Sequence, residues 1–423
     1  MRLIDYFDRG ADQYPDRACL VDGNQNWAYA EIRELSNRIA VGLLDTGLGH
    51  ESRVAVYSPN QAMAYACILG LTRAGCTWVT VNARNAIDEN TYILDNTETE
   101  WLFYHSSFEG FIDKVRADCP KIKNYVCLDK PGGYGPLLDD WMAPHTGTPP
   151  DLPHQPDAVA ALVSSGGTTG RPKGVMITHA GLETMNACFN AGMPVSSPPV
   201  YLMVAPMTHA AGITSFALLS FGATNVIMSK ADPEAIMETI EREKVTHLFL
   251  PPTVIYMMLA HPSVRKYDYS SLKNFIYAAA PMSADKLREA ISVFGPVMTQ
   301  TYGQAEAVMI CTYFSPEQHV EALAAGNERR LLSCGQPSLF TRLEIMDDDG
   351  NLLPHGESGE IVVRGGLVMK GYYKNPDATE EASQFGWHHT GDIGYKDEDD
   401  FVYIVDRKKD MIISGGFNVY PSE

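Results

Sequence analysis

Short apolar runs alternate along the chain with longer segments that carry one apolar face, and this alternation indicates strands and helices in turn. In the first third of the chain, apolar runs predict strands at Val54–Tyr57, Thr77–Val81, Trp101–Tyr104 and Tyr125–Leu128. The segment between the first two runs predicts a helix, with Asn60 as its N-cap and Gly75 at its end.

The same alternation returns after residues 131–156, a loop rich in Pro and Gly that indicates a boundary. Strands are predicted at Val159–Ser164, His247–Leu250, Asn274–Ala278 and Val297–Thr301. Helices are predicted from Pro233 to Glu243, with Asp232 as the cap, and from Ser283 to Phe294. This alternation predicts an α/β fold with two helix-covered, mostly parallel sheets.

From Leu343 onward the apolar runs become shorter, and turn signals such as Asp347–Gly350 separate them. This texture predicts a small antiparallel or β-barrel-like piece. Another stretch, Tyr201–Met228, contains no Asp, Glu, Lys or Arg, and a membrane span needs only about 20 apolar residues. Because Pro206 and Gly212 interrupt it, this stretch is instead predicted to form a strand, a loop, a helix and a strand.

The composition is that of a globular protein with more than one domain or subdomain: 45% of the 423 residues are hydrophobic and 20% are charged. Asp and Glu number 52 against 33 Lys and Arg, which gives a net charge of −19. Such a surface repels polyanions and argues against nucleic-acid binding and against docking on anionic lipid. The eight scattered cysteines and the acidic N-terminus favour a cytoplasmic protein without a signal peptide or a membrane span.

A loop of glycines and small hydroxyl residues follows the strand predicted at Val159–Ser164. Residues 164–174 read Ser-Ser-Gly-Gly-Thr-Thr-Gly-Arg-Pro-Lys-Gly. Their amides and hydroxyls can converge on a phosphate, while Arg171 and Lys173 add positive charge. This is not a Walker loop, because no Gly-Lys-Ser/Thr follows at the required spacing. A glycine pair alone would indicate a flexible surface loop, whereas the full string after a strand favours phosphate binding.

This string resembles the phosphate-binding loop of the adenylate-forming superfamily, which includes acyl- and aryl-CoA synthetases, amino-acid adenylation domains and luciferases. The usual Thr-Ser-Gly-Thr-Thr-Gly of the family is here Ser165–Gly170, with Gly166 in place of serine. The resemblance implies a loop that folds over the β- and γ-phosphates of ATP, with Thr169 and Lys173 acting in catalysis. The phosphate-binding residues that it implies are Ser165, Gly166, Gly167, Thr168, Thr169, Gly170 and Lys173.

The string Pro206–His209 resembles the next family motif, in which a catalytic histidine or aromatic residue lies between the acyl pocket and the adenylate. A single His on an apolar segment is more often a packed core residue, but its place 36 residues after Lys173 favours the motif. Amino-acid-adenylating relatives carry an aspartate just beyond this motif, whereas Ala210–Thr214 contains no acid. A free amino acid is therefore disfavoured as the substrate, since burying an unpaired ammonium is costly.

The string Ala278–Met282 resembles the family turn that lies against adenine, and it implies contacts from Ala279, Ala280 and Pro281. Taken alone, these small residues would equally fit a tightly packed strand end.

A further string, Gln300–Glu306, resembles the family's Tyr-Gly-x-Thr-Glu motif, with Ala305 in place of threonine. The resemblance implies that Tyr302 lies against adenine and that Gly303 lets the acyl carboxylate approach the α-phosphate. It also implies that Glu306 is catalytic and binds Mg²⁺, a cation that favours carboxylate oxygens. The nucleotide-binding residues implied here are Gln300, Thr301, Tyr302 and Gly303.

The string Trp387–Asp392 resembles the family's Trp-x-x-Thr-Gly-Asp motif, whose aspartate, here Asp392, accepts hydrogen bonds from the ribose hydroxyls. The adjacent His388 and His389 do not indicate a metal site, because neighbouring residues on a strand point to opposite faces. Further on, the resemblance implies that Arg407 reaches the ribose and that Lys409 is the hinge residue.

The resemblance spans the whole chain and implies a large N-terminal adenylation domain at 1–405, with subdomains at about 1–155, 156–335 and 336–405. Residues 406–410 are the implied hinge, and 411–423 open a C-terminal lid domain, most of which is expected to lie outside this sequence. The implied protein is a cytoplasmic AMP-forming acid–CoA ligase that uses ATP, Mg²⁺ and coenzyme A. A homodimer is left open.

The substrate is expected to be a hydrophobic carboxylic acid, because the segments implied to line its pocket are apolar. The residues implied to line that pocket are His209, Gly212, Ile213, Thr253, Ala278 and Gly303. A medium- or long-chain fatty acid is preferred, and an aromatic or terpenoid-derived acid is the alternative. Two other readings stay open: transfer of the acyl group to a carrier protein, and a non-enzymatic nucleotide-binding protein.

Overall fold

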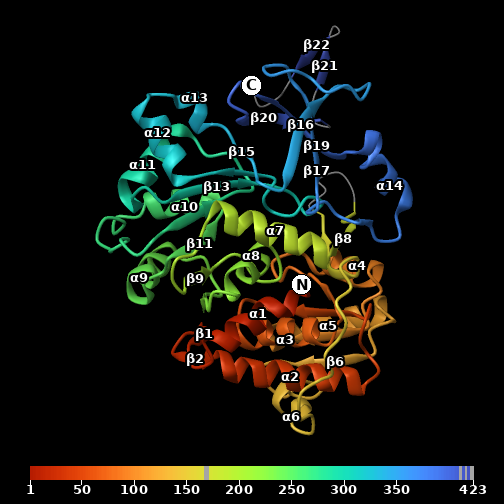
Figure 1. Ribbon diagram of the computed structural model, residues 1–423. Coiled ribbons are helices and arrows are strands. Elements are labelled where there is room, and N and C mark those ends of the chain that lie inside the picture. The colour runs from red at the N-terminus through yellow and green to blue at the C-terminus, as the bar shows by residue number, and fades with distance from the viewer. Residues whose placement is uncertain (166–170, 409–411, 415–416, 420–423) are drawn as a thin grey trace. The chain divides into compact units, whose positions relative to one another are not determined.

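The computed structural model of the chain describes residues 1–165, 171–408, 412–414 and 417–419 (Figure 1). The chain forms two compact units, and each is described by itself. The first unit consists of Met1–Asn186, Val195–Ala231 and Lys370–Tyr373, and the second of Ala187–Pro194, Asp232–Met369 and Lys374–Glu423. The subdomain boundaries proposed from the sequence stay predictions.

The first unit contains a seven-stranded sheet with parallel strands at its centre. Its strands, in sheet order, are β18 (Gly371–Tyr372), β8 (Gly174–Thr178), β7 (Val159–Ser164), β4 (Thr77–Val79), β3 (Arg53–Tyr57), β5 (Trp101–Tyr104) and β6 (Asn124–Cys127). All neighbouring pairs from β7 to β6 are parallel, whereas β8 pairs antiparallel with both β7 and β18. The glycine-rich string therefore joins the two strands of an antiparallel hairpin.

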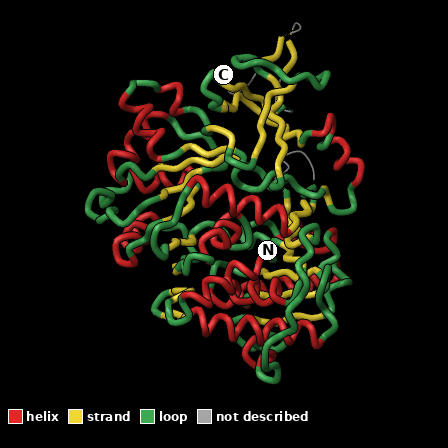
Figure 2. Tube along the Cα trace, in the orientation of Figure 1, coloured by secondary structure: helices red, strands yellow, loops and turns green. Residues whose placement is uncertain are grey.

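Helices cover both faces of this sheet, as the red and yellow segments of Figure 2 show. On one face, Ala55 and Tyr57 of β3 share a buried core with Ile93 and Ile112 of the covering helices. The alternate residues Val54 and Val56 are buried on the opposite face, as the period of a strand requires. The helices of this unit are α1 (Leu3–Gln13), α2 (Tyr29–Asp45), α3 (Ala62–Arg73), α4 (Ile87–Asn96), α5 (Glu109–Asp118), α6 (Leu138–Met142) and α8 (Ala210–Leu219), with α7 (His179–Gly192) running into the second unit.

The first unit also contains the strand group β9–β10–β1–β2, formed by Val200–Met203, Thr224–Ile227, Ala18–Asp22 and Gln25–Ala28. The pairs β9/β10 and β10/β1 are parallel, and β1/β2 is antiparallel. The uncharged stretch Tyr201–Met228 thus forms a strand, a loop, a helix and a strand, as predicted. Among the described residues, no helix has both the length and the apolar character needed to cross a membrane.

The second unit contains a strand group in the order β11–β12–β13–β14–β15, with β11 to β13 parallel and the last two pairs antiparallel. These strands are His247–Leu250, Asn274–Tyr277, Met298–Tyr302, Thr312–Phe314 and Gln336–Pro337. The helices of this unit are α9 (Pro233–Glu243), α10 (Pro252–Leu259), α11 (Ala284–Phe294), α12 (Pro316–Ala324), α13 (Glu328–Leu331) and α14 (Pro376–Glu381).

A four-stranded antiparallel sheet completes the described part of the second unit, together with a short hairpin. The sheet strands are β16 (Thr341–Met346), β17 (Gly359–Gly365), β19 (His388–Lys396) and β20 (Val402–Arg407), and the hairpin strands are β21 (Ile412–Ser414) and β22 (Phe417–Val419). The small antiparallel piece expected after Leu343 is confirmed.

Most predicted elements are present with boundaries within one or two residues, and α9 begins and ends as predicted. Its cap is also as predicted, because the Asp232 side chain accepts a hydrogen bond from Ala235 N at 2.9 Å. The predicted cap of α3 is wrong. Its N-cap is Gln61, and the first helical amide, Ala62 N, donates to Asp22 Oδ2 at 3.0 Å. Asn60 turns its side chain to a different part of the first unit.

Candidate active site

A cavity of about 340 Å³ lies within the second unit, where the ends of β12 and β13 meet strands β19 and β20. It brings together many of the residues that the resemblance implied for nucleotide binding. Those residues are Ala279, Ala280, Pro281, Gln300, Thr301, Tyr302, Gly303, Asp392 and Arg407. Ala278, implied for the acid pocket, lines the same cavity. Their roles in binding stay predictions.

Asp392 is the polar centre of this cavity and is only 3% exposed. Its Oδ2 atom accepts hydrogen bonds from the Tyr302 hydroxyl at 2.6 Å and from Gln304 Nε2 at 2.9 Å. Its Oδ1 atom lies 2.8 Å from Arg407 Nε. Three elements thus position one carboxylate: the end of β13, the turn after it, and β20.

Burial raises the pKa of the Asp392 carboxyl, while the Tyr302 hydroxyl and the Arg407 charge partly oppose that rise. Burial also raises the pKa of the Tyr302 hydroxyl, and the charge of Asp392 adds to the rise. Tyr302 therefore remains a hydrogen-bond donor at neutral pH. A carboxylate held in this way can accept further hydrogen bonds from hydroxyl groups of a ligand.

Two positions in the cavity wall have backbone requirements of their own. Ala279 has φ of 71°, a left-handed conformation that is uncommon for a residue with a side chain. At Gly303, an added Cβ would lie 2.5 Å from the Met309 carbonyl carbon and 2.9 Å from Ile310 N. Glycine is therefore required at position 303 by the chain that folds back over it, whatever a ligand needs.

The wall formed by β12 and β13 is supported by a buried polar chain. The Tyr277 hydroxyl donates to Gln300 Oε1 at 3.1 Å and lies 2.9 Å from His319 Nε2. His319 Nδ1 lies 2.6 Å from the Ser315 carbonyl. Beside Gln300, the buried Thr301 hydroxyl has no hydrogen-bond partner among the described residues.

In the first unit, the ends of the glycine-rich loop are held together. Ser165 N donates to the Lys173 carbonyl at 2.9 Å, and Lys173 N donates to Ser165 Oγ at 3.0 Å. The Lys173 ammonium lies 4.5 Å from the centre of the Tyr372 ring. The predicted residues Gly166, Gly167, Thr168, Thr169 and Gly170 lie outside the described residues.

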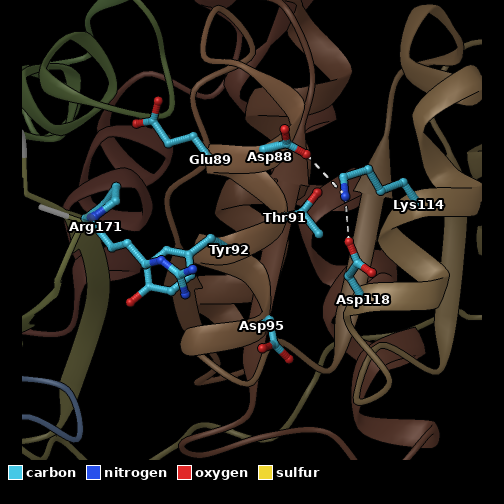
Figure 3. Close-up of a pocket in the computed structure, with 9 residues that line it drawn as sticks. Asp88, Glu89, Thr91, Tyr92, Asp95, Lys114, Asp118 and Arg171 are labelled. Atoms are coloured by element: carbon cyan, nitrogen blue, oxygen red, sulfur yellow. Dashed lines mark hydrogen bonds and ion pairs between the residues drawn. The ribbon is translucent and has the colours of Figure 1, made fainter.

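Arg171 turns its guanidinium onto the Tyr92 ring of α4, at 5.0 Å from the ring centre (Figure 3). Both residues line an open, mostly acidic pocket in the first unit. Lys114 of α5 bridges two of its carboxylates, at 3.2 Å from Asp88 and 2.7 Å from Asp118. Arg171 is thus an exposed residue whose guanidinium lies against an aromatic ring of α4.

His209 lies at the N-cap position of α8 and is partly exposed. Its amide donates to the Pro206 carbonyl at 3.0 Å, and its own carbonyl accepts from Ile213 N at 3.1 Å. Burial of the ring lowers the pKa of His209 to about 4, so the imidazole is neutral near pH 7. Beside it, Gly212 packs against the Met207 carbonyl so closely that an added Cβ would lie 1.8 Å away.

The six residues implied for the acid pocket are divided between the two units. His209, Gly212 and Ile213 belong to the first, whereas Thr253, Ala278 and Gly303 belong to the second. Ile213 is 5% exposed, and Thr253 is an exposed residue of α10.

Glu306, the implied magnesium ligand, is half-buried in the turn after β13, and its carbonyl accepts a hydrogen bond from Met369 N at 2.7 Å. Among the described residues, no group of three or more His, Cys, Asp or Glu side chains could hold a metal ion by itself. A single carboxylate suits Mg²⁺, which keeps most of its waters and is shared with phosphates. The implied hinge residue Lys409 lies outside the described residues.

Several cavity residues were missed by sequence reasoning, namely Gln304, Leu332, Cys334, Ile404, Val405 and Asp406. Gln304 lies within the string Gln300–Glu306, so its place beside Tyr302 and Gly303 could have indicated a role in the site. Its amide donates to both Asp392 and the Thr390 carbonyl, at 2.9 and 2.8 Å. Asp406 likewise opens the string implied to be the hinge, whereas the other four carry no local pattern that distinguishes them from ordinary strand and loop residues.

Residues 7–373 match the family of AMP-binding enzymes, and the chain belongs to this family. It is 41% identical to the medium/long-chain-fatty-acid–CoA ligase FadD8 of Mycobacterium tuberculosis over 273 residues, which cover 64% of this chain and 46% of that protein. It is 34% identical to a feruloyl-CoA synthase of Amycolatopsis over 98% of this chain and 80% of that protein.

The fold is also that of solved adenylate-forming enzymes. A Mycobacterium tuberculosis fatty acyl CoA synthetase superposes with a TM-score of 0.88 at 27% identity, covering all of this chain and 81% of the other. The α/β fold expected from the sequence is thus confirmed. The relatives are named as CoA ligases and synthetases, which supports an AMP-forming acid–CoA ligase class for this chain.

Proposed function

We propose that this protein activates a hydrophobic carboxylic acid with ATP as an acyl-adenylate and then transfers the acyl group to coenzyme A. The observation that carries the proposal is the buried Asp392, which Tyr302, Gln304 and Arg407 hold in one cavity. Such a carboxylate suits the two hydroxyls of a ribose, and the small residues Ala278–Ala280 leave room for a flat base beside it.

The chemistry begins with a poor acyl donor, since a carboxylate would have to expel oxide. The carboxylate oxygen attacks the α-phosphorus of ATP, the bond to pyrophosphate breaks, and a mixed anhydride with AMP forms. The thiolate of coenzyme A then attacks the acyl carbon and releases AMP. Positioning and charge stabilisation are what the protein must supply.

Different residues of the chain supply the positioning and the charge stabilisation. Asp392 and Arg407 orient the ribose, and Lys173, the residue just before β8, brings a cation to the phosphates. Glu306 is the carboxylate that would hold Mg²⁺, and this ion would neutralise phosphate charge when bound. His209, neutral near pH 7, lies beside the acid without adding a charge to it.

For the acid we propose a medium- or long-chain fatty acid, supported by the 41% identity to the FadD8 ligase. An aromatic acid is the second candidate, favoured by the similarity to the feruloyl-CoA synthase over nearly the whole chain. A cytoplasmic location, coenzyme A as acceptor and the residue roles above are parts of the same proposal.

The test is acid-dependent exchange of labelled pyrophosphate into ATP by the complete gene product, with straight-chain acids of increasing length and cinnamic-type acids as the panel. Exchange that peaks with a fatty acid supports the first candidate, and a peak with an aromatic acid supports the second. Thioester formation is then compared with coenzyme A and with a holo carrier protein. An absence of exchange with every acid would support a non-enzymatic nucleotide-binding protein.

A further inference from the structure

Asn60 lies between β3 and α3 in the first unit and is 8% exposed. Its side-chain amide is the centre of a compact set of hydrogen bonds to main-chain groups distant in the sequence. Asn60 Oδ1 accepts from Met207 N at 2.8 Å. Asn60 Nδ2 donates to the Ala205 carbonyl at 2.9 Å and to the Met228 carbonyl at 3.1 Å, with longer contacts to the Val204 and Met203 carbonyls at 3.3 and 3.4 Å.

The two shortest bonds to the 205–207 segment fall on either side of Pro206. Ala205 supplies its carbonyl and Met207 its amide, so the side chain of Asn60 pairs with this turn as a peptide group would. Pro206 has no N–H group of its own. Asn60 supplies hydrogen-bond partners for the main-chain groups on either side of it, the Ala205 carbonyl and the Met207 amide.

The turn leads directly to His209. Its amide donates to the Pro206 carbonyl at 3.0 Å, and α8 starts at the next residue. The position of the imidazole therefore depends on where the Pro206 carbonyl is held. Asn60 fixes the residues on both sides of that carbonyl, and it does so without contacting His209.

We propose that Asn60 is a positioning residue for the acid-binding site, and that its amide holds the Ala205–Met207 turn so that His209 keeps one orientation beside the acid. The role of His209 at the acid rests on the proposed function. The contacts of Asn60 do not, because they involve only described residues of the first unit.

The sharpest variant is Asn60→Asp, which keeps the shape and the acceptor for Met207 N but removes both donors. A carboxylate oxygen would then face the Ala205 and Met228 carbonyl oxygens and repel them. We expect KM for the acid to rise about tenfold or more, with KM for ATP changed less than about threefold. Asn60→Ser keeps one donor and one acceptor on a shorter side chain, so it should raise KM for the acid by a smaller factor.

The control is Asn90→Asp, a change at another buried asparagine of the first unit. Asn90 Nδ2 donates to the Asn82 carbonyl at 2.9 Å, outside the 203–209 segment. This variant loses a comparable buried donor, so it should lower the thermal unfolding midpoint in the same way while leaving KM for the acid unchanged. An equal rise in KM for the acid in both variants would make Asn60 merely structural and overturn the proposal.

A readout independent of activity is the rate at which diethyl pyrocarbonate modifies His209, measured by peptide mass spectrometry on the folded chain. The rate should rise several-fold in Asn60→Asp and Asn60→Ser and stay at the wild-type value in Asn90→Asp. An unchanged rate at His209, or an unchanged KM for the acid in an active Asn60→Asp protein, overturns the proposal. If wild-type protein shows no acid-dependent exchange, the proposed function fails, and the modification rate still tests the role of Asn60.

Discussion

Asp392 and Arg407 are direct partners across β19 and β20, and their side chains form an ion pair of 2.8 Å at one end of this strand pair. The pair is asymmetric, because the Asp392 side chain is 4% exposed whereas that of Arg407 is 53% exposed. The carboxylate therefore belongs to the wall of the cavity, and the guanidinium can move with little cost. A ligand with two hydroxyl groups could take the place of Arg407 at Asp392, and the carboxylate would keep its hydrogen bonds from Tyr302 and Gln304.

Replacing Asp392 by Asn should weaken ATP binding about ten- to hundredfold, because hydrogen bonds to a charged acceptor are lost at the ribose. Calorimetric titration with magnesium-ATP measures this directly. The matched control is Glu344→Gln, which removes a carboxylate of the same antiparallel sheet that pairs with Lys396 outside the cavity. Equal losses of affinity in the two variants would contradict a ribose-binding role for Asp392.

Replacing Gly303 by Ala should destabilise the protein by about 1–3 kcal/mol, because the new methyl group would overlap the backbone at Met309 and Ile310. Thermal unfolding followed by circular dichroism measures the change. The comparison is Gly110→Ala in α5, where an added Cβ meets no atom within 4 Å and the helix should gain about 0.5–1 kcal/mol. A Gly303→Ala protein of unchanged stability would show that the 309–310 segment can move away.

Local signals account for the parts of the fold that were predicted correctly. The helix Pro233–Glu243 has its cap, its first-turn proline and its apolar face within residues 232–243, so nothing distant was needed to define it. The strand Val159–Ser164 is likewise defined by its own apolar run. Asn60 is different. It satisfies the local rule for a cap, but the 203–207 segment and Met228 compete for its amide, and those partners become visible only in the fold.

The candidate site also contains residues that local sequence signals predict and residues that only the tertiary structure brings together. Tyr302 and Asp392 were predicted because each stands in a string whose residue types suit a nucleotide, and the structure joins them by a hydrogen bond of 2.6 Å. Leu332 and Cys334 line the same cavity but come from the segment just after α13, which has no such string. Their presence depends on how that segment folds back, a property of the tertiary structure.

Replacing Tyr92 by Ala should raise KM for ATP about two- to fivefold, since an exposed cation–π contact is worth about 0.5–1 kcal/mol. The physical reason is that Arg171, close to the phosphate-binding string, would lose the ring on which its guanidinium lies. Tyr92→Phe keeps the ring and should behave as wild type. Steady-state kinetics at saturating acid gives both values.

Tyr134→Ala is the matched control for that change. It removes another tyrosine ring of the first unit, over which Arg116 lies at 5.7 Å, away from the phosphate-binding string. It should leave KM for ATP unchanged. If Tyr92→Phe lost as much affinity as Tyr92→Ala, the hydroxyl rather than the ring would be responsible.

The buried His319 should make the protein less stable as the pH falls. Burial lowers its pKa from 6.5 to about 4, so between these values the unfolded chain binds a proton that the folded chain does not. The stability associated with the neutral ring is therefore fully present above about pH 6.5 and is lost as the pH falls toward 4. At about 1.4 kcal/mol for each pKa unit, this lowering of the pKa corresponds to on the order of 3 kcal/mol of unfolding free energy.

His319→Gln tests this dependence, because glutamine can keep the hydrogen bonds to Ser315 and Tyr277 without titrating. The variant should therefore show a smaller difference than wild type between the thermal unfolding midpoints at about pH 7.5 and about pH 5. His355→Gln, at an exposed histidine paired with Asp400, should leave that difference as in wild type. An equal narrowing in both variants would show that the acid sensitivity does not come from the buried ring.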